Sequence, residues 1–171
     1  MSKLAPLNFK RWIEEHRHLL KPPVGNAQIW PDREFMVTVV GGPNSRTDFH
    51  INEGEEFFYQ VEGDITLRCL VDGRVEVHEI REGDVFLLPP NVPHSPQRPA
   101  GTVGLVIERR RLPHEQDTLL WICEGCGDEL HRASFHLTDL VAQLPPVFDR
   151  YWGNPAHTTC RGCGRAHVRP S

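Results

Sequence analysis

Short apolar runs separated by turn residues constrain the fold of this chain more than any other feature. Asp72-Gly73 separates two of the runs, which is a strong signal for a tight hairpin, and Glu62-Gly63-Asp64 and Glu82-Gly83-Asp84 mark further turns. Many short strands at this spacing predict an all-β antiparallel sandwich or barrel. The runs are residues 35–40, 57–61, 65–71, 74–80, 85–89 and 103–108.

Two parts of the chain lie outside this β pattern. Residues 8–20 predict an amphipathic helix, because Asn8 can cap it and apolar residues recur at three- and four-residue spacing. Residues 109–117 are interpreted as a linker, and the tail beyond them predicts one short helix, 138–144, stopped by Pro145-Pro146. We therefore expect a main domain over residues 1–110 and an extension over residues 111–171. The apolar face of the first helix consists of Phe9, Trp12, Ile13, Leu19 and Leu20.

Composition argues against several kinds of partner. The 171 residues carry a formal net charge of −4, and the only basic block is Arg109-Arg110-Arg111, so nucleic acid is not an expected ligand. No apolar run approaches the ~20 residues of a membrane span, and the N-terminus lacks the apolar core of a signal peptide. We expect a cytoplasmic protein whose five cysteines stay reduced.

Three residues predict a catalytic metal site: His50, Glu56 and His94. Two imidazoles and one carboxylate can bind one face of Fe(II) and leave positions open for substrate and oxygen. A structural metal is usually closed by four protein ligands, so open positions indicate catalysis. A regular strand over residues 50–56 would place His50 and Glu56 on one face and Glu55 on the other. A turn at 52–54 would remove that argument and leave Glu55 as the rival.

Two Cys-x-x-Cys-Gly knuckles predict a second metal site in the tail. Four thiolates close a tetrahedral site, and the glycine after each pair permits the tight turn that aims backbone N–H groups at sulfur. Soft thiolates suit iron or zinc, and the spacing does not choose between them. Because a closed site has no open position, we assign it to stability, with disulfides as the alternative. The four ligands are Cys123, Cys126, Cys160 and Cys163.

The spacing of the first site resembles the cupin family. His50 to Gly63 is similar to the first cupin motif and Gly83 to His94 to the second, although Asn52 stands where most cupins have another His and Asn91 where most have Gly. Nearly the whole chain is similar to bacterial 3-hydroxyanthranilate 3,4-dioxygenases. The similarity is carried by "LNFKRW" (7–12), "LLKPPVGN" (19–26), "VTVVGGPNSRTDFH" (37–50), "EEFFYQVEG" (55–63), "EGDVFLLPPNVPHSPQRP" (82–99) and "LVIER" (105–109).

This resemblance implies a fold and a reaction. The fold would be a cupin double-stranded β-helix, a jelly-roll barrel, with an N-terminal helix and a C-terminal rubredoxin-like segment. The reaction would open the ring of 3-hydroxyanthranilate with O2 to give 2-amino-3-carboxymuconate 6-semialdehyde, the precursor of quinolinate in pyridine nucleotide synthesis or an intermediate of tryptophan catabolism. The resemblance also implies catalytic Fe(II), a second iron or zinc on the four cysteines, and a homodimer, in whose interface Phe57 and Tyr59 would lie if they do not pack inside the barrel.

The resemblance further implies roles for four residues. Arg98 would bind the substrate carboxylate, for which a forked cation is suited. Glu108 would contact the substrate and help a proton move. Arg46 corresponds to the arginine near bound oxygen, where a cation can stabilise developing negative charge. Glu56 would be both a metal ligand and the acceptor of a substrate proton.

Two other functions remain as alternatives. One is a cupin that only binds a small molecule, with the four-cysteine tail as a zinc ribbon for a partner; Arg46 and Arg98 beside the ligands argue against it. The other is a different metal-dependent cupin enzyme such as a sugar isomerase, which usually needs four ligands and is disfavoured by Asn52.

Overall fold

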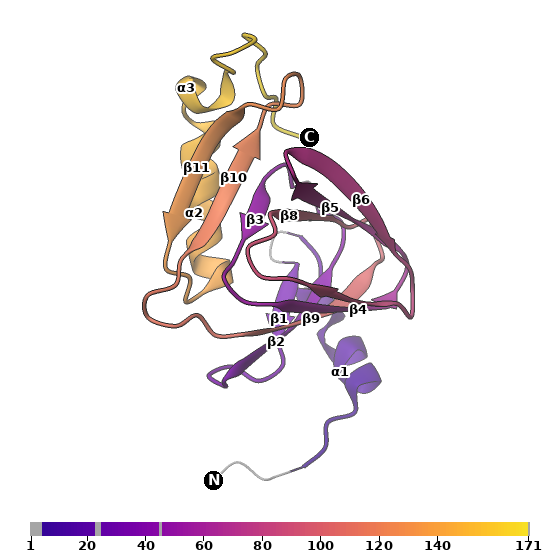
Figure 1. Cartoon of the computed structure of the whole chain (residues 1–171). Coiled ribbons are helices and arrows are strands. Elements are labelled where there is room, and N and C mark those ends of the chain that lie inside the picture. Colours follow the sequence, from indigo (N-terminus) through magenta and orange to yellow (C-terminus); the bar gives the residue numbers. More distant parts are fainter. Residues whose placement is uncertain (1–4, 23–24, 45, 171) are drawn as a thin grey trace.

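The computed structural model describes residues 5–22, 25–44 and 46–170, so Pro23, Val24 and Ser45 of the motifs quoted above lie outside the described residues. Two antiparallel sheets face each other and form the body of the molecule (Figure 1). The first sheet has the order β1 (Asn26–Gln28), β2 (Phe35–Gly41), β9 (Val103–Arg109), β4 (Glu56–Glu62) and β7 (Val85–Leu88). The second has the order β11 (Glu129–Phe135), β10 (Asp117–Ile122), β3 (Phe49–Ile51), β8 (His94–Gln97), β5 (Ile65–Val71) and β6 (Arg74–Ile80).

All six predicted strands are present, and the expected double-stranded β-barrel is confirmed. The hairpin between β5 and β6 turns at Asp72 and Gly73, whose φ values of 48° and 73° are those of a two-residue turn that follows the strand twist. Three further strands, β1, β3 and β8, are only three or four residues long. The sequence does not predict them, because each is short and, unlike the four-residue β7, is not a continuous apolar run.

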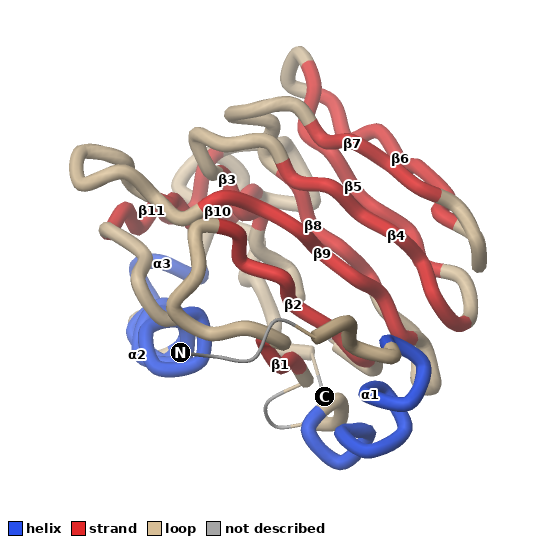
Figure 2. Tube along the Cα trace, turned by 90° about the horizontal axis from the view of Figure 1, so that it is seen from below, coloured by secondary structure: helices blue, strands red, loops and turns tan. Residues whose placement is uncertain are grey.

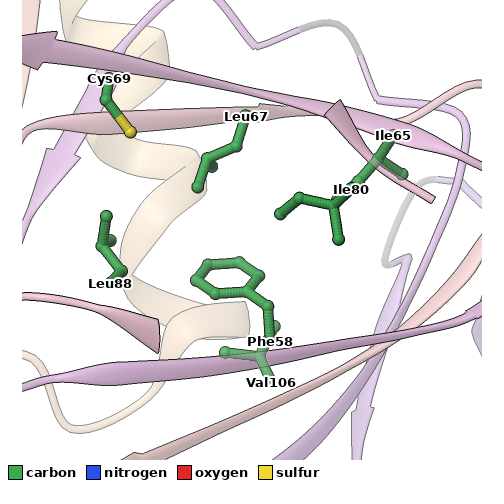
Figure 3. Close-up of a cluster of buried hydrophobic side chains, with 7 residues drawn as sticks. All are labelled: Phe58, Ile65, Leu67, Cys69, Ile80, Leu88 and Val106. Carbon is green, nitrogen blue, oxygen red and sulfur yellow. The ribbon is translucent and has the colours of Figure 1, made fainter. Parts of the chain in front are cut away.

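The core lies between the two sheets (Figure 3). Phe58 and Val106 point inward from the first sheet and meet Leu67 and Ile80 of the second. Cys69 is buried in the same cluster. Removing these side chains from water is the main stabilisation of the barrel.

The predicted N-terminal helix is confirmed as α1 (Phe9–His16), which continues into a 3-10 turn, Arg17–Leu19. The side chain of Asn8 caps α1 by accepting a hydrogen bond from the Arg11 backbone N–H at 2.9 Å. Ile13 packs against Val39 on the outer face of the first sheet. The prediction was wrong for Leu19, which is 38% exposed, because the change to a 3-10 turn rotates it off the apolar face.

The tail beyond residue 117 is more ordered than its sequence suggested. β10 and β11 form a hairpin covered by the helix α2 (Leu140–Trp152), and the short helix α3 (Pro155–Thr158) follows (Figure 2). The expected stop at Pro145-Pro146 was wrong, since both prolines lie inside α2. Proline removes a backbone hydrogen bond, but the apolar face of α2 packs Val147 and Tyr151 onto β10, which offsets that loss.

Residues 109–117 do connect β9 to β10, but they are not a free linker, because Arg111 and Asp117 are buried there. β10 also pairs with β3, so the second sheet continues from the main domain into the tail. The division at residues 110 and 111 stays a prediction. None of the helices in the described ranges is long and apolar enough to cross a membrane.

Candidate active site

The structure brings His50, Glu56 and His94 together between the two sheets. His50 on β3 and His94 on β8 are direct cross-strand neighbours in the second sheet, and Glu56 begins β4 in the first. One ligand atom from each residue lies within 4.8 Å of the others, and all three side chains are buried. We call these residues the His/Glu cluster.

Glu56 reaches this cluster for a reason other than strand parity. The strand is not regular from 50 to 56: β3 ends at Ile51, a turn follows, and β4 starts at Glu56 in the opposite sheet. His50 and Glu56 therefore meet across the barrel interior, not along one strand face. Glu55 is exposed, so the structure favours Glu56 over its rival.

Each histidine of the cluster is oriented by a hydrogen bond on its other ring nitrogen. Nε2 of His50 lies 2.6 Å from Oδ2 of Asp117, and Nδ1 of His94 lies 3.0 Å from the carbonyl oxygen of Val92. This leaves Nδ1 of His50 at 3.7 Å and Nε2 of His94 at 3.3 Å from Oε1 of Glu56. Two imidazole nitrogens and a carboxylate with this support are typical of a mononuclear metal site with open positions, so the residues fit a ferrous ion.

Burial and neighbouring charges set the protonation of the cluster. The pKa of His94 is raised, because the nearby Glu56 outweighs the effect of burial, so a metal ion would displace a proton from this imidazole. Burial alone raises the pKa of Glu56, but the neighbouring His94 and His50 outweigh it and the pKa is lowered. Burial is also the largest influence on the pKa of His50, which is lowered, so this imidazole stays neutral. A neutral imidazole and an ionised carboxylate are the forms that bind metal.

Asn52 and Glu108 extend the site beside Glu56. Asn52 Nδ2 donates to Oε1 of Glu56 and, at 3.2 Å, to Oε2 of Glu108. Glu108 is directly opposite Glu56 in the neighbouring strand. Burial and the nearby Glu56 raise the pKa of Glu108 above that of an ordinary carboxyl group. Asn52 therefore supports two carboxylates at the position where many cupins have a fourth ligand.

Arg98, just after β8, is a buried cation with few partners. Its Nη1 donates to Oε1 of Gln60 at 3.4 Å, and within the described residues its Nε has no hydrogen-bond partner. Burial, together with Arg46 nearby, lowers the pKa of Arg98 to about 10. A cavity of about 640 Å³ also touches Arg98, but its lining includes Asp64 and Glu79 and none of His50, Glu56 and His94, so it is not the space beside the His/Glu cluster. A buried guanidinium whose Nε has no hydrogen-bond partner among the described residues is suited to an anionic ligand.

Arg46 lies near the cluster but is already paired. Its Nε donates to Oδ1 of Asp48 at 3.1 Å and its Nη2 donates to Oδ2. Its guanidinium also lies 6.0 Å from the ring centroid of Phe148 on α2. The structure therefore places Arg46 between the barrel and the tail, held by a buried carboxylate.

Sequence reasoning missed two residues of the site, Arg111 and Asp117, because both lie in the segment interpreted as a linker. Arg111 donates to Asp117 through Nε and Nη2 and to Oε2 of Glu108 through Nη1, each at 2.6 Å. The signal for them in the sequence is the basic block at residues 109–111, because an arginine that becomes buried needs an acidic partner.

The four predicted cysteines converge at the end of the β10–β11 hairpin. Sγ of Cys123 lies 3.6 Å from Sγ of Cys163, and Sγ of Cys126 lies 3.5 Å from Sγ of Cys160. All four are free thiols, so the disulfide alternative is not supported. Zinc–sulfur bonds of ~2.3 Å in a tetrahedron separate sulfurs by ~3.8 Å, which fits these distances.

The two knuckles repeat one backbone pattern. Gly127 donates to the carbonyl of Cys123 at 2.8 Å, and Gly164 donates to that of Cys160 at 2.9 Å. Both glycines have positive φ, 82° and 74°, which a residue with a Cβ rarely adopts. The predicted tight turns are therefore present, and in the first knuckle the Gly125 N–H donates to Sγ of Cys123 at 3.4 Å.

Comparison with known proteins agrees with this geometry. The family model described as 3-hydroxyanthranilic acid dioxygenase matches residues 1–152. The 3-hydroxyanthranilate 3,4-dioxygenase of Xanthomonas campestris pv. campestris is 53% identical over 98% of this chain and 94% of its own length. Those of Ruegeria pomeroyi and Burkholderia cenocepacia are 52% and 53% identical over 98% of this chain and 93% and 95% of their own lengths.

Two solved structures of other proteins are similar at lower identity. The polyketide cyclase RemF from Streptomyces resistomycificus is 19% identical with a TM-score of 0.42, over 78% of this chain and 80% of its own. Hydroxypropylphosphonic acid epoxidase from S. wedmorenis is 19% identical with a TM-score of 0.36, over 44% of this chain and 41% of its own. On the family match and the identity of its relatives over nearly their whole length, the chain belongs to the 3-hydroxyanthranilic acid dioxygenase family.

Proposed function

We propose that the chain converts 3-hydroxyanthranilate and O2 to 2-amino-3-carboxymuconate 6-semialdehyde, the precursor of quinolinate. Both oxygen atoms enter the product, and the bond between ring carbons 3 and 4 is broken. The observation that carries the proposal is the His/Glu cluster together with Arg98, a buried guanidinium close enough to Glu56 to interact with its charge and with no partner for Nε among the described residues. An aromatic acid with adjacent hydroxyl and amino groups suits both features.

His50, Glu56 and His94 would hold Fe(II). When bound, this ion would supply open positions for the substrate and the one-electron chemistry that O2 requires. The relatives carry this activity in their names, and the matched region covers 98% of this chain.

Arg98 would orient the substrate by binding its carboxylate. The guanidinium can offer Nε and a terminal nitrogen to two carboxylate oxygens, which is the arrangement that favours arginine over lysine. Gln60 holds the other edge of the guanidinium, so the free edge has a defined direction. Because the site is buried, such an ion pair is strengthened by the exclusion of water.

Glu108 and Glu56 would accept protons from the substrate's hydroxyl and amino groups. Burial beside Glu56 raises the pKa of Glu108, which makes it a better proton acceptor for a hydroxyl or amino group than an ordinary glutamate. Arg111 and Asn52 hold the carboxylate of Glu108 in place. Arg46 would contribute positive charge on the side where oxygen reacts, with Asp48 fixing its direction.

The assay is direct. Full-length protein loaded anaerobically with Fe(II) is mixed with 3-hydroxyanthranilate and air, and absorbance of the semialdehyde and oxygen uptake are followed. We expect one O2 consumed per ring opened. His94→Ala should remove activity and leave the metal on the four cysteines. Substrate binding without oxygen uptake would refute the proposal in favour of a binding protein.

The four-cysteine cluster would bind iron or zinc as a structural metal. Its ligands hold the β10–β11 hairpin to the segment after α3, which has little apolar sequence of its own. Four free thiolates require a reducing compartment, so we also propose a cytoplasmic location. Metal analysis of protein expressed with either ion in excess would identify the occupant.

We infer that two copies of the chain pair through the outer face of the first sheet. Phe57 and Tyr59 lie on that face, opposite the barrel interior, and continue an apolar row with Leu87 and Val85, which are 54% and 62% exposed. Exposed apolar rows of this kind mark interaction sites. Leu87→Glu should give a monomer in sedimentation, whereas Val77→Glu on the second sheet should not; a dimer that survives Leu87→Glu would place the interface elsewhere.

A further inference from the structure

We propose that Arg111 and Asp117 are positioning residues for the metal centre: Arg111 locks Asp117 against His50 and ties this pair to Glu108. This inference rests on the proposed function, because it assumes that His50 binds the metal. It assigns a role to a segment that follows both cupin motifs and that the sequence presents as a connection between strands.

The contacts form one continuous chain. Oδ2 of Asp117 accepts from Nε2 of His50 and from Nη2 of Arg111, both at 2.6 Å. Nε of Arg111 reaches Oδ1 of the same carboxylate at 2.6 Å, and Nη1 reaches Oε2 of Glu108 at 2.6 Å. One guanidinium thus uses three nitrogens to hold two carboxylates, which the single ammonium of a lysine cannot reproduce.

Burial raises the energetic cost of breaking these ion pairs. The side chains of Arg111, Asp117 and Glu108 are only 2%, 0% and 6% exposed. Without Arg111, two buried carboxylates would stand near each other and near Glu56 with no cation between them, and a buried charge without its partner is strongly unfavourable. The simplest relaxation would move Asp117 away from His50 or admit water, and either change frees the imidazole to turn.

The location in the fold explains what the chain of contacts achieves. Glu108 lies on β9 of the first sheet, whereas Asp117 begins β10, which pairs with β3 of the second sheet. His50 is itself the β3 partner of Leu119. Arg111 therefore joins the two sheets at the edge of the His/Glu cluster and fixes a metal ligand of one sheet relative to an acid of the other. Hydrogen bonds to the non-ligating nitrogen of a histidine set ring orientation and ligand basicity.

The test measures metal affinity, because a role confined to folding would not change it in a folded variant. Full-length Asp117→Asn, Arg111→Lys, Arg109→Lys and His50→Ala are titrated anaerobically with Fe(II), and with Co(II) alone, against a competing chromophoric chelator. The metal content of the four-cysteine cluster and circular dichroism report folding. Arg109→Lys is the matched control, because Arg109 pairs with Glu115 in the same segment and does not contact His50.

We expect His50→Ala to abolish binding at the His/Glu cluster and keep the metal of the four-cysteine cluster. Asp117→Asn should weaken binding at the His/Glu cluster by about 10- to 100-fold, the range typical of hydrogen-bond partners of metal ligands. Arg111→Lys should weaken it about 10-fold and, like Asp117→Asn, change the absorption bands of bound Co(II). Arg109→Lys should match the parent in both measurements.

The outcomes separate the two proposals. If folded Asp117→Asn binds metal as tightly as the parent, or if Arg109→Lys weakens binding as much as Arg111→Lys does, the positioning role is refuted. In either case, loss of binding at the His/Glu cluster in His50→Ala would still support the proposed metal site. Parent-like affinity in His50→Ala refutes the site itself. If Arg111→Lys does not fold, Asp117→Asn, which keeps the shape of the side chain, decides alone.

Discussion

Gly104 on β9 leaves the space in which the guanidinium of Arg98 lies. A Cβ added at Gly104 would lie 2.6 Å from Nη1 of Arg98 and 3.0 Å from Oε1 of Gln60. Ordinary contact begins at 3.4 Å, so the guanidinium would have to withdraw by about 0.8 Å. Gly104→Ala therefore shifts the residue proposed to bind the substrate carboxylate without removing any charge.

The expected loss follows from the hydrogen bonds at stake. A charge-assisted hydrogen bond contributes ~1.5–3 kcal/mol, so loss of one of two such bonds should lower kcat/KM for 3-hydroxyanthranilate by about 10- to 150-fold. Because the carboxylate is bound before and during the reaction, most of the change should be in KM. Activity is measured as semialdehyde formation under anaerobic loading and aerobic turnover.

Two controls separate this cause from general damage. Gly54→Ala meets nothing nearer than 3.6 Å and should be close to the parent. The compound 2-aminophenol lacks the carboxylate, so its slower turnover should be almost unaffected by Gly104→Ala. Equal losses with both compounds, or no loss with 3-hydroxyanthranilate, would refute the assignment of Arg98.

Three other predictions concern stability and the second metal. Trp121 is fully buried, and its ring centroid lies 4.1 Å from that of Tyr151. Trp121→Ala should lower the free energy of unfolding, measured in urea, by ~3–5 kcal/mol, whereas Trp30→Ala, at a half-exposed position, should change it by less than ~0.5 kcal/mol. Similar values for both variants would contradict the core assignment. Hydrogen bonds from Arg109 and from the Leu112 backbone lower the pKa of Glu115 from 4.5 to about 2. The ionised carboxylate therefore contributes fully to stability above pH 4.5, and this contribution is lost as the pH falls toward 2. Glu115→Gln should lower the free energy of unfolding near neutral pH, and its difference from the parent should shrink between pH 4.5 and 2. A difference that does not depend on pH would argue against the ion pair. Cys160→Ser should remove the thiolate-bound metal and lower Tm, whereas the metal at His50, Glu56 and His94 should be retained in metal analysis. Loss of both metals would mean that the two sites do not fold independently.

The sequence by itself determined the local features of this protein. Turn residues and short apolar runs placed six of the barrel strands and the Asp72-Gly73 hairpin within a residue or two of their observed ends. The spacing of the four cysteines was sufficient to group them, because each Cys-x-x-Cys-Gly turn is a closed local unit. Residue type also identified His50, Glu56 and His94, since metal ligands need particular donor atoms wherever they lie.

Only the tertiary structure decided how these parts meet. His50 and Glu56 converge because they lie on opposite sheets, not on one strand face, and α2 continues through two prolines because its apolar face covers β10. Arg111 and Asp117 were inconspicuous in a charged connection and became part of the site through burial. The physical reason is that a charge in water needs no partner, whereas a buried charge must find one from any part of the chain, so the partners of Arg111 could be recognised only after the sheets had closed around them.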